Sequence, residues 1–426
     1  MLPYFTADLP GIGGVLRTTD EDFRVDEVPA YEPSGAGEHV FARIEKRGLT
    51  TPHAVKAIAR ALGVRERDVG VAGMKDRYAV TTQWVSLPPP VTPEAVRALA
   101  IDGVKVLEAI RHGHKLRTGH VRANRFKLRV RGVDPDAIER ARAILARLAE
   151  APGAPNFYGE QRFGRDGDNA AKGRALLAER GERGRAGRVE PVNAAGLDPV
   201  DASGIETAEA TDEMPESEAS EAAAARDELP AAGADAASDT DAERDRREGQ
   251  RRAKRKGKRT GREAGTRDER MDRLMVSALQ SELFNAWLAA RLADGLYRDA
   301  VVGDVMHKVG GGLFECADAA VDGPRVRAGE IIPTGPMFGG SMRRPIEGSA
   351  EAVREQAILD AAGLTIGQFA VARAIAEGTR RDAAIAVVDV TLEVVEAVAG
   401  IDIAFTLPGG AYATVVMREL MKLAEA

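Results

Sequence analysis

Alternation of apolar and polar residues predicts β-strands in the first part of the chain. Residues 15–46 contain two such runs, "GVLRTTDEDFRVDEVPA" and "EHVFARIEKRG". The next segment, "TTPHAVKAIARALG", has helical spacing, with Thr51 as the expected N-cap, Pro52 in the first turn and Gly63 at the exit. A short strand in "DVGVAGM", a turn and a strand in "AVTTQWVSL" follow. Strands that are adjacent in sequence pair mostly antiparallel, so the pattern predicts an α+β fold.

The middle of the chain follows helical periodicity instead. Apolar residues recur at helical spacing in three segments, 169–182, 271–294 and 349–377. Strand alternation returns in "AAIAVVDVTLEVV" and in "IAFTLPGGAYATVVMREL", and the second of these runs closes in a helix. We therefore expect the last strands to rejoin the sheet formed by the first ones. This organisation predicts a first domain made of residues 1–154 and 378–426, with an inserted domain at 155–377.

A highly charged segment interrupts the inserted domain at residues 195–270. Its first part, 201–243, carries 14 acidic groups and one Arg, and its second part, 244–270, carries 13 Lys or Arg and five acidic groups. With almost no large apolar residues it cannot bury a core, so we expect it to be disordered. Its basic half can attract an RNA backbone or balance its own acidic half. The remaining body of the chain is near neutral, so nucleic-acid binding has to come from local patches.

Composition excludes several classes of protein. No apolar run is long enough to span a bilayer, and we see no basic start followed by an apolar stretch that would mark a secretion signal. The single cysteine, Cys316, excludes a disulfide framework and fits a cytoplasmic location, where a lone thiol is most simply a core side chain. Only His112 and His114 have a spacing that suits a metal, and they lack a cysteine companion, so we expect no metal site.

A basic segment lies at residues 111–132. Its sequence, "RHGHKLRTGHVRANRFKLRVRG", holds eight Lys or Arg, three His and no acidic residue. The end of the segment alternates, so that apolar and basic side chains lie on opposite faces of a strand: Phe126, Leu128 and Val130 on one, and Lys127, Arg129 and Arg131 on the other. A basic sheet face favours RNA or another polyanion as partner. The alternative is a solvated face whose cations prevent edge aggregation.

The turn between two apolar strand-like runs contains Lys75, Asp76 and Arg77. A carboxylate flanked by two cations is expected to stay ionised, which suits a nucleophile or a general base rather than a general acid. The small residues before it, Ala72 and Gly73, allow a substrate backbone to approach closely. The alternative interpretation is a solvated turn, because such triplets are common on protein surfaces.

Seven segments, collinear along the chain, resemble the TruD family of tRNA pseudouridine synthases. The triplet belongs to "VAGMKDRYAVTTQWVSL", which resembles the family signature around its catalytic aspartate. "DEDFRVDEVPAYEPSGAGEHVFARIEKRGLTT" resembles the N-terminal block, and "HKLRTGHVRANRF" resembles the Lys-Leu-Arg and Asn-x-Phe block. "PNFYGEQRFG", "SALQSELFN", "PTGPMFG" and "FTLPGGAYATVVMREL" resemble the later ones. The resemblance covers nearly the whole chain except 195–270, and seven ordered motifs are far more specific than one.

The resemblance implies a fold, a substrate and a reaction. The fold would be the shared pseudouridine synthase catalytic core, a mixed but largely antiparallel sheet flanked by helices, with an inserted α/β domain special to this family. The substrate would be tRNA, with uridine 13 of the D stem as the target, whose base becomes reattached through carbon instead of nitrogen. The resemblance implies no cofactor and no metal. Nothing in the sequence demands a dimer, so we expect a monomer.

Residues that match the family motifs take their expected roles from them. Asp76 corresponds to the catalytic aspartate, acting either as a nucleophile on the nucleoside or as the base that removes the ribose 2′ proton. Lys75 and Arg77 would keep Asp76 charged or contact phosphate, unless they are merely solvated cations of a turn. Phe23 matches an aromatic residue that the family places near the target base, where a flipped uracil can stack. The alternative for Phe23 is a core position on a strand.

Two further motifs supply candidate RNA-binding residues. Asn124 and Phe126 match the Asn-x-Phe pair, in which Asn124 can read an edge of uracil and Phe126 can stack or merely fill the core. Arg162 lies in "PNFYGEQRFG" at the expected domain junction, where we expect a structural hinge with some RNA contact. The chain departs from the family in the order of two aromatic residues of this motif, in Phe338, where Trp is frequent, and in the charged insertion.

A function of a different class would use the same basic segments. A non-catalytic RNA-binding or RNA-chaperone protein would differ from a synthase because it would not need the Asp76 carboxylate. A hydrolase with a nucleophilic serine or cysteine is disfavoured, because no Gly-x-Ser-x-Gly motif occurs and Cys316 has no candidate base near it in sequence.

Overall fold

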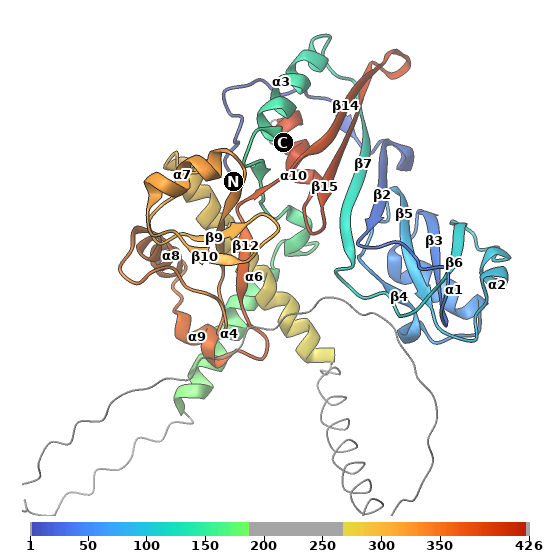
Figure 1. Ribbon diagram of the computed structural model, residues 1–426, viewed down its shortest axis with the longest axis horizontal. Coiled ribbons are helices and arrows are strands. Elements are labelled where there is room, and N and C mark those ends of the chain that lie inside the picture. Colours follow the sequence, from blue (N-terminus) through green and yellow to red (C-terminus); the bar gives the residue numbers. More distant parts are fainter. Residues whose placement is uncertain (1, 187–266, 423–426) are drawn as a thin grey trace, which may run out of the picture. The chain divides into compact units, whose positions relative to one another are not determined.

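The computed structural model describes residues 2–186 and 267–422 of the chain, and almost all of them belong to one compact unit. Figure 1 shows the described elements coloured along the sequence. The predicted disorder of 195–270 falls outside the described residues, except at Arg267–Arg270, which are the first residues of a helix. None of the helices in the described ranges is long and apolar enough to cross a membrane.

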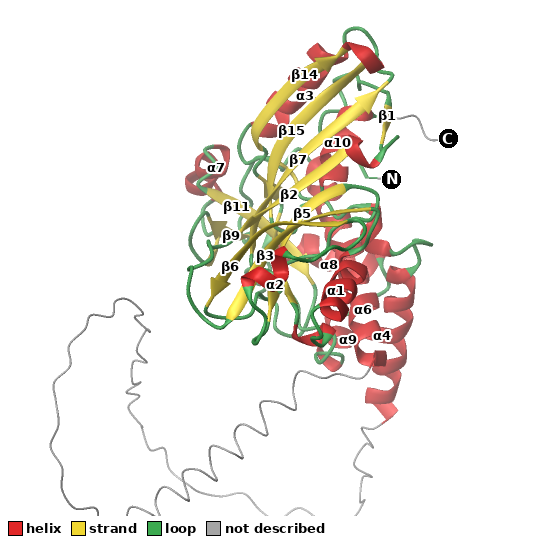
Figure 2. Cartoon of the chain, turned by 90° about the vertical axis from the view of Figure 1, so that its right-hand side faces the viewer, coloured by secondary structure: helices red, strands yellow, loops and turns green. Residues whose placement is uncertain are grey.

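Nine strands of the described part of the chain form one sheet, seen most clearly in Figure 2. These strands are β1 (Val15–Leu16), β2 (Phe23–Pro29), β3 (His39–Arg47), β4 (Gly70–Val71), β5 (Val80–Leu87), β6 (Val104–His112), β7 (Val121–Arg131), β14 (Val388–Val395) and β15 (Gly400–Pro408). Their order is β14-β15-β7-β2-β5-β3-β6, with β1 beside β7 and β4 beside β5. β2 and β5 run parallel, and the other pairs are antiparallel. The sheet is therefore mixed but largely antiparallel, as predicted.

The last strands of the chain join the first ones, which confirms the expectation from their alternation. β15 pairs with β7 from Ile401 opposite Val130 to Pro408 opposite Ala123, and β14 lies outside β15. Strands from the two ends of the sequence thus lie side by side within one sheet.

Helices bury the apolar side of this sheet. They are α1 (Thr51–Ala61), α2 (Pro93–Arg97), α3 (Ala137–Ala149) and α10 (Ala413–Met421), with short 3-10 turns η1 (Asp20–Asp22), η2 (Glu66–Asp68) and η4 (Glu396–Val398). The predicted alternation of β7 is confirmed, because its apolar side chains share a core with α3 and α10: Phe126, Leu128, Val130, Ile144, Leu148 and Leu420. Burying each large apolar side chain contributes about 1.5–3 kcal/mol, so this core fixes the position of β7.

The start of α1 differs from the prediction in one residue. Thr50, not Thr51, is the N-cap, and its side chain accepts a hydrogen bond from the His53 N–H. Pro52 occupies the first turn, and Gly63 follows the helix with a φ of +66°, both as expected. The Thr51 hydroxyl is therefore released from capping and is available to contacts outside the helix.

A second group of elements comes from the middle of the chain. Its strands β9 (Val305–Lys308), β10 (Leu313–Glu315), β11 (Ile331–Met337) and β12 (Thr379–Asp382) form an antiparallel sheet in the order β10-β9-β11-β12, and β8 (Ala154–Pro155) pairs with β13 (Ala384–Ile385). Its helices are η3 (Glu160–Phe163), α4 (Asn169–Ala186), α6 (Arg267–Ala293), α7 (Ala319–Arg327), α8 (Ala350–Ala361) and α9 (Ile366–Val371). The three predicted helical segments are thus helical, the last one as two helices, and the α+β class is confirmed.

Candidate active site

The loop from β4 to β5 carries Asp76, and its backbone is held from two sides. The Lys75 N–H donates to Thr51 Oγ1 (2.9 Å), and the Thr51 hydroxyl in turn donates to Gln83 Oε1 (2.9 Å). The Asp76 carbonyl accepts a hydrogen bond from Lys46 Nζ (2.6 Å). Partners on α1, β3 and β5 therefore fix the loop, while the Asp76 side chain stays 55% exposed.

The cation that contacts Asp76 comes from a distant part of the chain. Arg17 Nη2 donates to Asp76 Oδ2 at 2.9 Å. The Arg17 guanidinium also lies over the Phe23 ring, 4.0 Å from its centroid. Arg17 has a φ of +63°, in the left-handed region that residues other than glycine seldom adopt. Such a conformation persists only where the surrounding structure demands it, and it often marks a functional site.

The neighbours of Asp76 in sequence have other partners. Lys75 Nζ lies 2.7 Å from Glu27 Oε2 and donates to Asn124 Oδ1 (2.9 Å), and the Lys75 side chain is only 7% exposed. Arg77 is exposed, and its Nε donates to the Gly48 carbonyl (3.0 Å). The expected flanking by these two cations is not what the structure shows, because Arg17 is the ion-pair partner of Asp76. Contact of Lys75 or Arg77 with phosphate stays a prediction.

Three further candidates lie on neighbouring strands close to this loop. In the register of β2 and β7, Asn124 is opposite Glu27 and Phe126 is opposite Val25, while Phe23 lies two residues before Val25. The rings of Phe23 and Phe126 are 6.4 Å apart and nearly perpendicular, and both are almost fully buried. The structure thus gives both rings a core position. Stacking on a base stays a prediction, and for Phe23 it requires that Arg17 leave the ring face.

Lys46 is a site residue that sequence analysis missed. It is fully buried, and in addition to the Asp76 carbonyl its ammonium contacts the Leu49 carbonyl (2.8 Å). Burial lowers its pKa to about 8, a shift that the charge of Asp76 opposes. In the sequence it stands near the end of a strand in "RIEKRG", a setting typical of a solvated cation, so no local signal marked it.

Glu27 was missed as well, although the sequence holds a signal for it. It follows Phe23 and Val25 at the spacing of one strand face, and those two residues are buried in the core. An acidic residue at an inward position predicts a buried charge with a partner. The structure supplies that partner in Lys75, and the backbone N–H of Trp84 donates to Glu27 Oε1 (3.0 Å).

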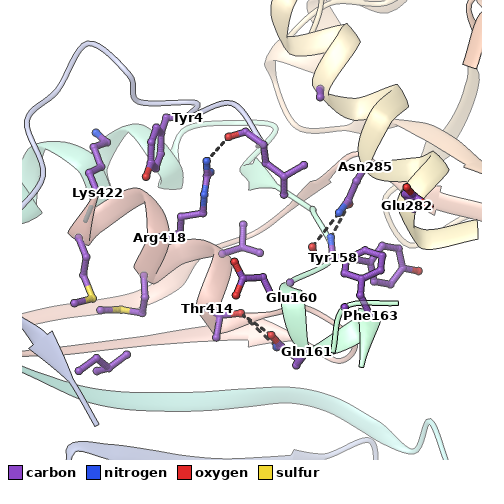
Figure 3. Close-up of a pocket in the computed structure, with 18 of the residues that line it drawn as sticks. Tyr4, Tyr158, Glu160, Gln161, Phe163, Glu282, Asn285, Thr414, Arg418 and Lys422 are labelled. Carbon is purple, nitrogen blue, oxygen red and sulfur yellow. Dashed lines mark hydrogen bonds between the residues drawn. The ribbon is translucent and has the colours of Figure 1, made fainter. Parts of the chain in front are cut away.

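A cleft of about 1330 Å³ is lined in part by Val15 and Leu16, the two residues that precede Arg17 in sequence, but neither Arg17 nor Asp76 lines it. Figure 3 shows the rest of its wall, which comes from the N-terminal segment, η3, α6 and α10 and includes Tyr4, Glu160, Gln161, Phe163, Glu282, Arg418 and Lys422. Gln161 and Thr414 share a hydrogen bond across this wall (3.3 Å). The cleft combines apolar surface with amide, hydroxyl and charged groups, which suits a nucleotide better than a purely apolar ligand.

Arg162 holds η3 against α6 and does not line this cleft. Its Nε donates to Ser281 Oγ (3.0 Å), and its second nitrogen bonds to Ser277 Oγ. The guanidinium also lies 5.4 Å from the centroid of the Tyr158 ring. These contacts fit the structural part of the predicted hinge, and the RNA contact of Arg162 stays a prediction.

Acids from neighbouring segments neutralise much of the basic face of β7. Arg129 makes two hydrogen bonds to Asp402 of β15 (2.6 and 2.8 Å), and Arg131 makes a similar pair with Asp22 of η1 (2.7 and 2.9 Å). These hydrogen bonds are the main cause that lowers the pKa of both carboxyl groups. Lys127 Nζ lies 3.6 Å from Asp402. All three cations therefore have acidic partners, which lie elsewhere in the sequence, and RNA binding by this face stays a prediction.

The histidine pair with metal-like spacing does come together. His112 Nε2 and His114 Nε2 are 3.2 Å apart, and burial lowers the pKa of His112, with a smaller contribution from His114. Within the ranges that the structure describes, no group of three or more metal-ligating side chains gathers. Two imidazoles alone fall short of the ligand set of a structural or catalytic zinc site.

Cys316 has the environment expected of a core thiol. It is fully buried, and burial together with the nearby Asp322 carboxylate raises its pKa to about 12. A thiol that stays protonated cannot serve as a nucleophile at neutral pH. The structure thus adds to the reasons against a cysteine hydrolase.

Comparisons with known proteins point to one family. A family model described as tRNA pseudouridine synthase D (TruD) matches residues 2–184 and 205–420 of this chain. A tRNA pseudouridine synthase D of Anaeromyxobacter dehalogenans (strain 2CP-C) is 47% identical over 422 residues, which cover 99% of this chain and 96% of that protein. The protein of the same name from a strain of Thermus thermophilus is 33% identical over 422 residues, covering 99% of this chain and 92% of that protein. A crystal structure from Methanosarcina mazei described as TruD shares the fold, with a TM-score of 0.64, 22% identity and coverage of 99% of this chain and 96% of that one.

Proposed function

Because the chain belongs to the tRNA pseudouridine synthase D (TruD) family, we propose that it converts uridine 13 of tRNA to pseudouridine with Asp76 as the catalytic residue. It is an isomerase of the tRNA pseudouridine synthase class. The observation that carries the catalytic assignment is the loop itself. Its backbone is anchored by Thr51 and Lys46, while the carboxylate at its tip remains exposed and paired with Arg17.

The reaction needs a carboxylate that is ionised and held firmly in position. The bond between C1′ of the ribose and N1 of the base breaks, the base turns, and C1′ bonds to C5, which loses its hydrogen as N1 gains a proton. Asp76 acts either as the nucleophile on the nucleoside or as the base that removes the 2′ proton, and both roles require its negative charge. The Arg17 guanidinium stabilises that charge. An anchored backbone then holds the carboxylate in place without a cost of reorganisation.

The same atoms are present in substrate and product, so the chemistry calls for no redox partner and no group carrier. We expect tRNA as the macromolecular partner and a monomer as the working form. We also propose that residues 1–154 and 378–426 form the catalytic domain and that 155–377 form the inserted domain. The pairing of β15 with β7 supports this division, whereas β12, which follows the proposed boundary, pairs with β11 of the second group.

Tritium release from tRNA transcripts carrying 5-[³H]-uridine tests this proposal. The new bond at C5 expels the hydrogen, so release reports the chemistry directly. We expect release by the wild type, loss of release when uridine 13 is replaced by cytidine, and no detectable release by Asp76→Asn with tRNA binding retained. Asp102→Asn, which removes an exposed carboxylate far along the chain from the loop, is the matched control and is expected to retain activity.

Two outcomes would contradict the proposal in different ways. Equal release by wild type and Asp76→Asn would exclude the catalytic role of Asp76. No release by the wild type from any tRNA, combined with tight binding, would favour the non-catalytic RNA-binding protein. In that case Asp76→Asn should bind as well as the wild type or better, because it removes a negative charge next to phosphate.

A further inference from the structure

Among the Phe, Tyr and Trp residues of this chain, Tyr78 alone has an exposed side chain. All 11 Phe, six Tyr and two Trp residues lie in the described ranges, and the others are buried or half-buried, whereas Tyr78 is 64% exposed. Burial of an aromatic ring is strongly favourable, so its exposure forgoes a large gain. A single exposed apolar side chain means little on most surfaces, but this ring lies two residues from Asp76. Its position therefore calls for a contact outside the chain.

The backbone on both sides of Tyr78 is fixed. On one side the Asp76 carbonyl accepts the hydrogen bond from Lys46 (2.6 Å), and on the other side the chain enters β5, whose residues are all buried. The Arg77 guanidinium lies over the Tyr78 ring, 5.5 Å from its centroid, and its Nε is tied to the Gly48 carbonyl (3.0 Å). The attraction between the cation and the ring favours this orientation of the ring. Tyr78 is thus presented to solvent on a well-supported loop.

Part of the ring surface is left free by the protein. Within the described part of the chain, Arg77 is the only cation over the ring, no second aromatic ring is stacked against it, and its hydroxyl has no hydrogen-bond partner. Two residues of extended chain span at most about 7 Å, so the ring lies within reach of a nucleotide next to the one on which Asp76 acts. Every base has a flat face on which an aromatic ring can stack.

We propose that the Tyr78 ring stacks on a base next to the target in the tRNA strand, and so takes the place of the base that leaves the stack. The inference rests on the proposed function and adds a contact with a nucleotide other than the target. A base within a stem has to leave its stack before an enzyme can act on it, which costs unstacking energy. A ring that covers the exposed neighbour recovers part of this energy, and it does so only in the flipped state. Because every base has such a face, the contact holds the strand open without selecting its sequence.

Substitutions of Tyr78 separate stacking from the burial of apolar area. The measurement is single-turnover tritium release from the 5-[³H]-uridine transcript at saturating enzyme. We expect Tyr78→Ala and Tyr78→Leu to lower the rate constant about ten-fold, because leucine restores apolar volume without a π face. Tyr78→Phe keeps that face and loses only the hydroxyl, so its rate constant should stay within about two-fold of the wild type. Met74→Ala removes another exposed apolar side chain of the same loop and is the matched control, expected to behave as the wild type.

Transcripts that lack one base test the contact from the side of the RNA. Each carries an abasic nucleotide on the 5′ or on the 3′ side of the tritiated target. At one of the two positions the loss of the base should abolish the difference between wild type and Tyr78→Ala, since the ring then has nothing on which to stack. That position identifies the neighbour, and at the other position the difference should remain. Urea unfolding should give the same midpoint for all these variants as for the wild type, because the substituted side chains are exposed.

The possible failures are distinguishable. Equal rate constants for wild type and Tyr78→Ala would overturn the inference, and so would equal rate constants for Tyr78→Leu and Tyr78→Phe, or an equal loss in Met74→Ala. A difference between wild type and Tyr78→Ala that persists with both abasic transcripts would overturn it as well, because the ring would then act on something other than a neighbouring base. In each of these cases release from the intact transcript by the wild type upholds the synthase. Absence of release by the wild type would instead overturn the proposed function, and the inference with it.

Discussion

Replacing Lys46 by methionine removes a buried charge beneath the Asp76 loop and keeps a side chain of similar length. The Lys46 ammonium is fully buried and donates to the carbonyls of Leu49 (2.8 Å) and Asp76 (2.6 Å). The variant leaves these two carbonyls without their donor. It also removes the energetic penalty of a charge held out of water, so its effect on stability depends on which of the two terms is larger.

At neutral pH the loss of the two hydrogen bonds and the relief of the buried charge are comparable in free energy. Hydrogen bonds to charged groups contribute about 1.5–3 kcal/mol each. Burial lowers the pKa of Lys46 from 10.5 to about 8, a shift worth about 3 kcal/mol. Between these pH values the unfolded chain keeps a proton on Lys46 that the folded chain has released, so the free energy of unfolding rises with pH. The penalty is fully present below pH 8 and is lost as the pH rises toward 10.5.

Urea unfolding at pH 7, 8, 9 and 10, followed by tryptophan fluorescence, measures this contribution. Other groups titrate in both proteins, so the difference between wild type and Lys46→Met isolates Lys46. We expect that difference to shift by about 2–3 kcal/mol in favour of the wild type from pH 7 to pH 10. A difference that stays constant over this range would refute the reasoning, because it would mean that Lys46 keeps the same pKa in both states. Single-turnover release at pH 7 should fall about ten-fold in the variant, since the backbone carbonyl of Asp76 loses its anchor.

Three further outcomes follow from contacts in the structure. Arg17→Met should lower single-turnover release at least ten-fold. It should change the free energy of unfolding by less than about 1 kcal/mol, because the ion pair of Arg17 with Asp76 is partly exposed. A larger loss of unfolding free energy, sufficient to account for the lost activity, would contradict this. Asp402→Asn frees Arg129, so filter binding at several salt concentrations should show tighter RNA binding than that of the wild type. The slope of the logarithm of the binding constant against the logarithm of the salt concentration should be steeper by about one unit. Cys316 should react with a thiol reagent at pH 8 only after unfolding, because the native thiol is buried with a pKa of about 12; stoichiometric labelling of the native protein would be the contrary result.

Periodicity along the sequence identified the elements and their faces. The strand at β7 alternates as its apolar and basic residues indicate, and the closing strands join the first sheet. Pro52 and Gly63 mark the beginning and the end of α1. These features depend on residues that are close in sequence, where side-chain spacing and backbone preference act directly. The cap of α1 shows the limit of such reasoning, since Thr50 and Thr51 are equivalent as a local signal and only the contacts of Thr51 with the loop distinguish them.

Charge partners depended on the tertiary structure. The triplet around Asp76 suggested its sequence neighbours as partners, whereas Arg17 supplies the cation and Lys75 is turned into a buried pair with Glu27. The absence of acids in the segment that forms β7 suggested an open basic face, whereas β15 brings Asp402 beside it.

The sequence by itself thus determined the α+β class, the strands, the helices and the family motifs with their candidate aspartate. The tertiary structure decided which charges meet and which are buried. The physical reason is that secondary structure follows from local periodicity, whereas an electrostatic interaction depends on distance in space and on exclusion of water. Both of these are set by strand order and register, which pair residues that the sequence keeps far apart.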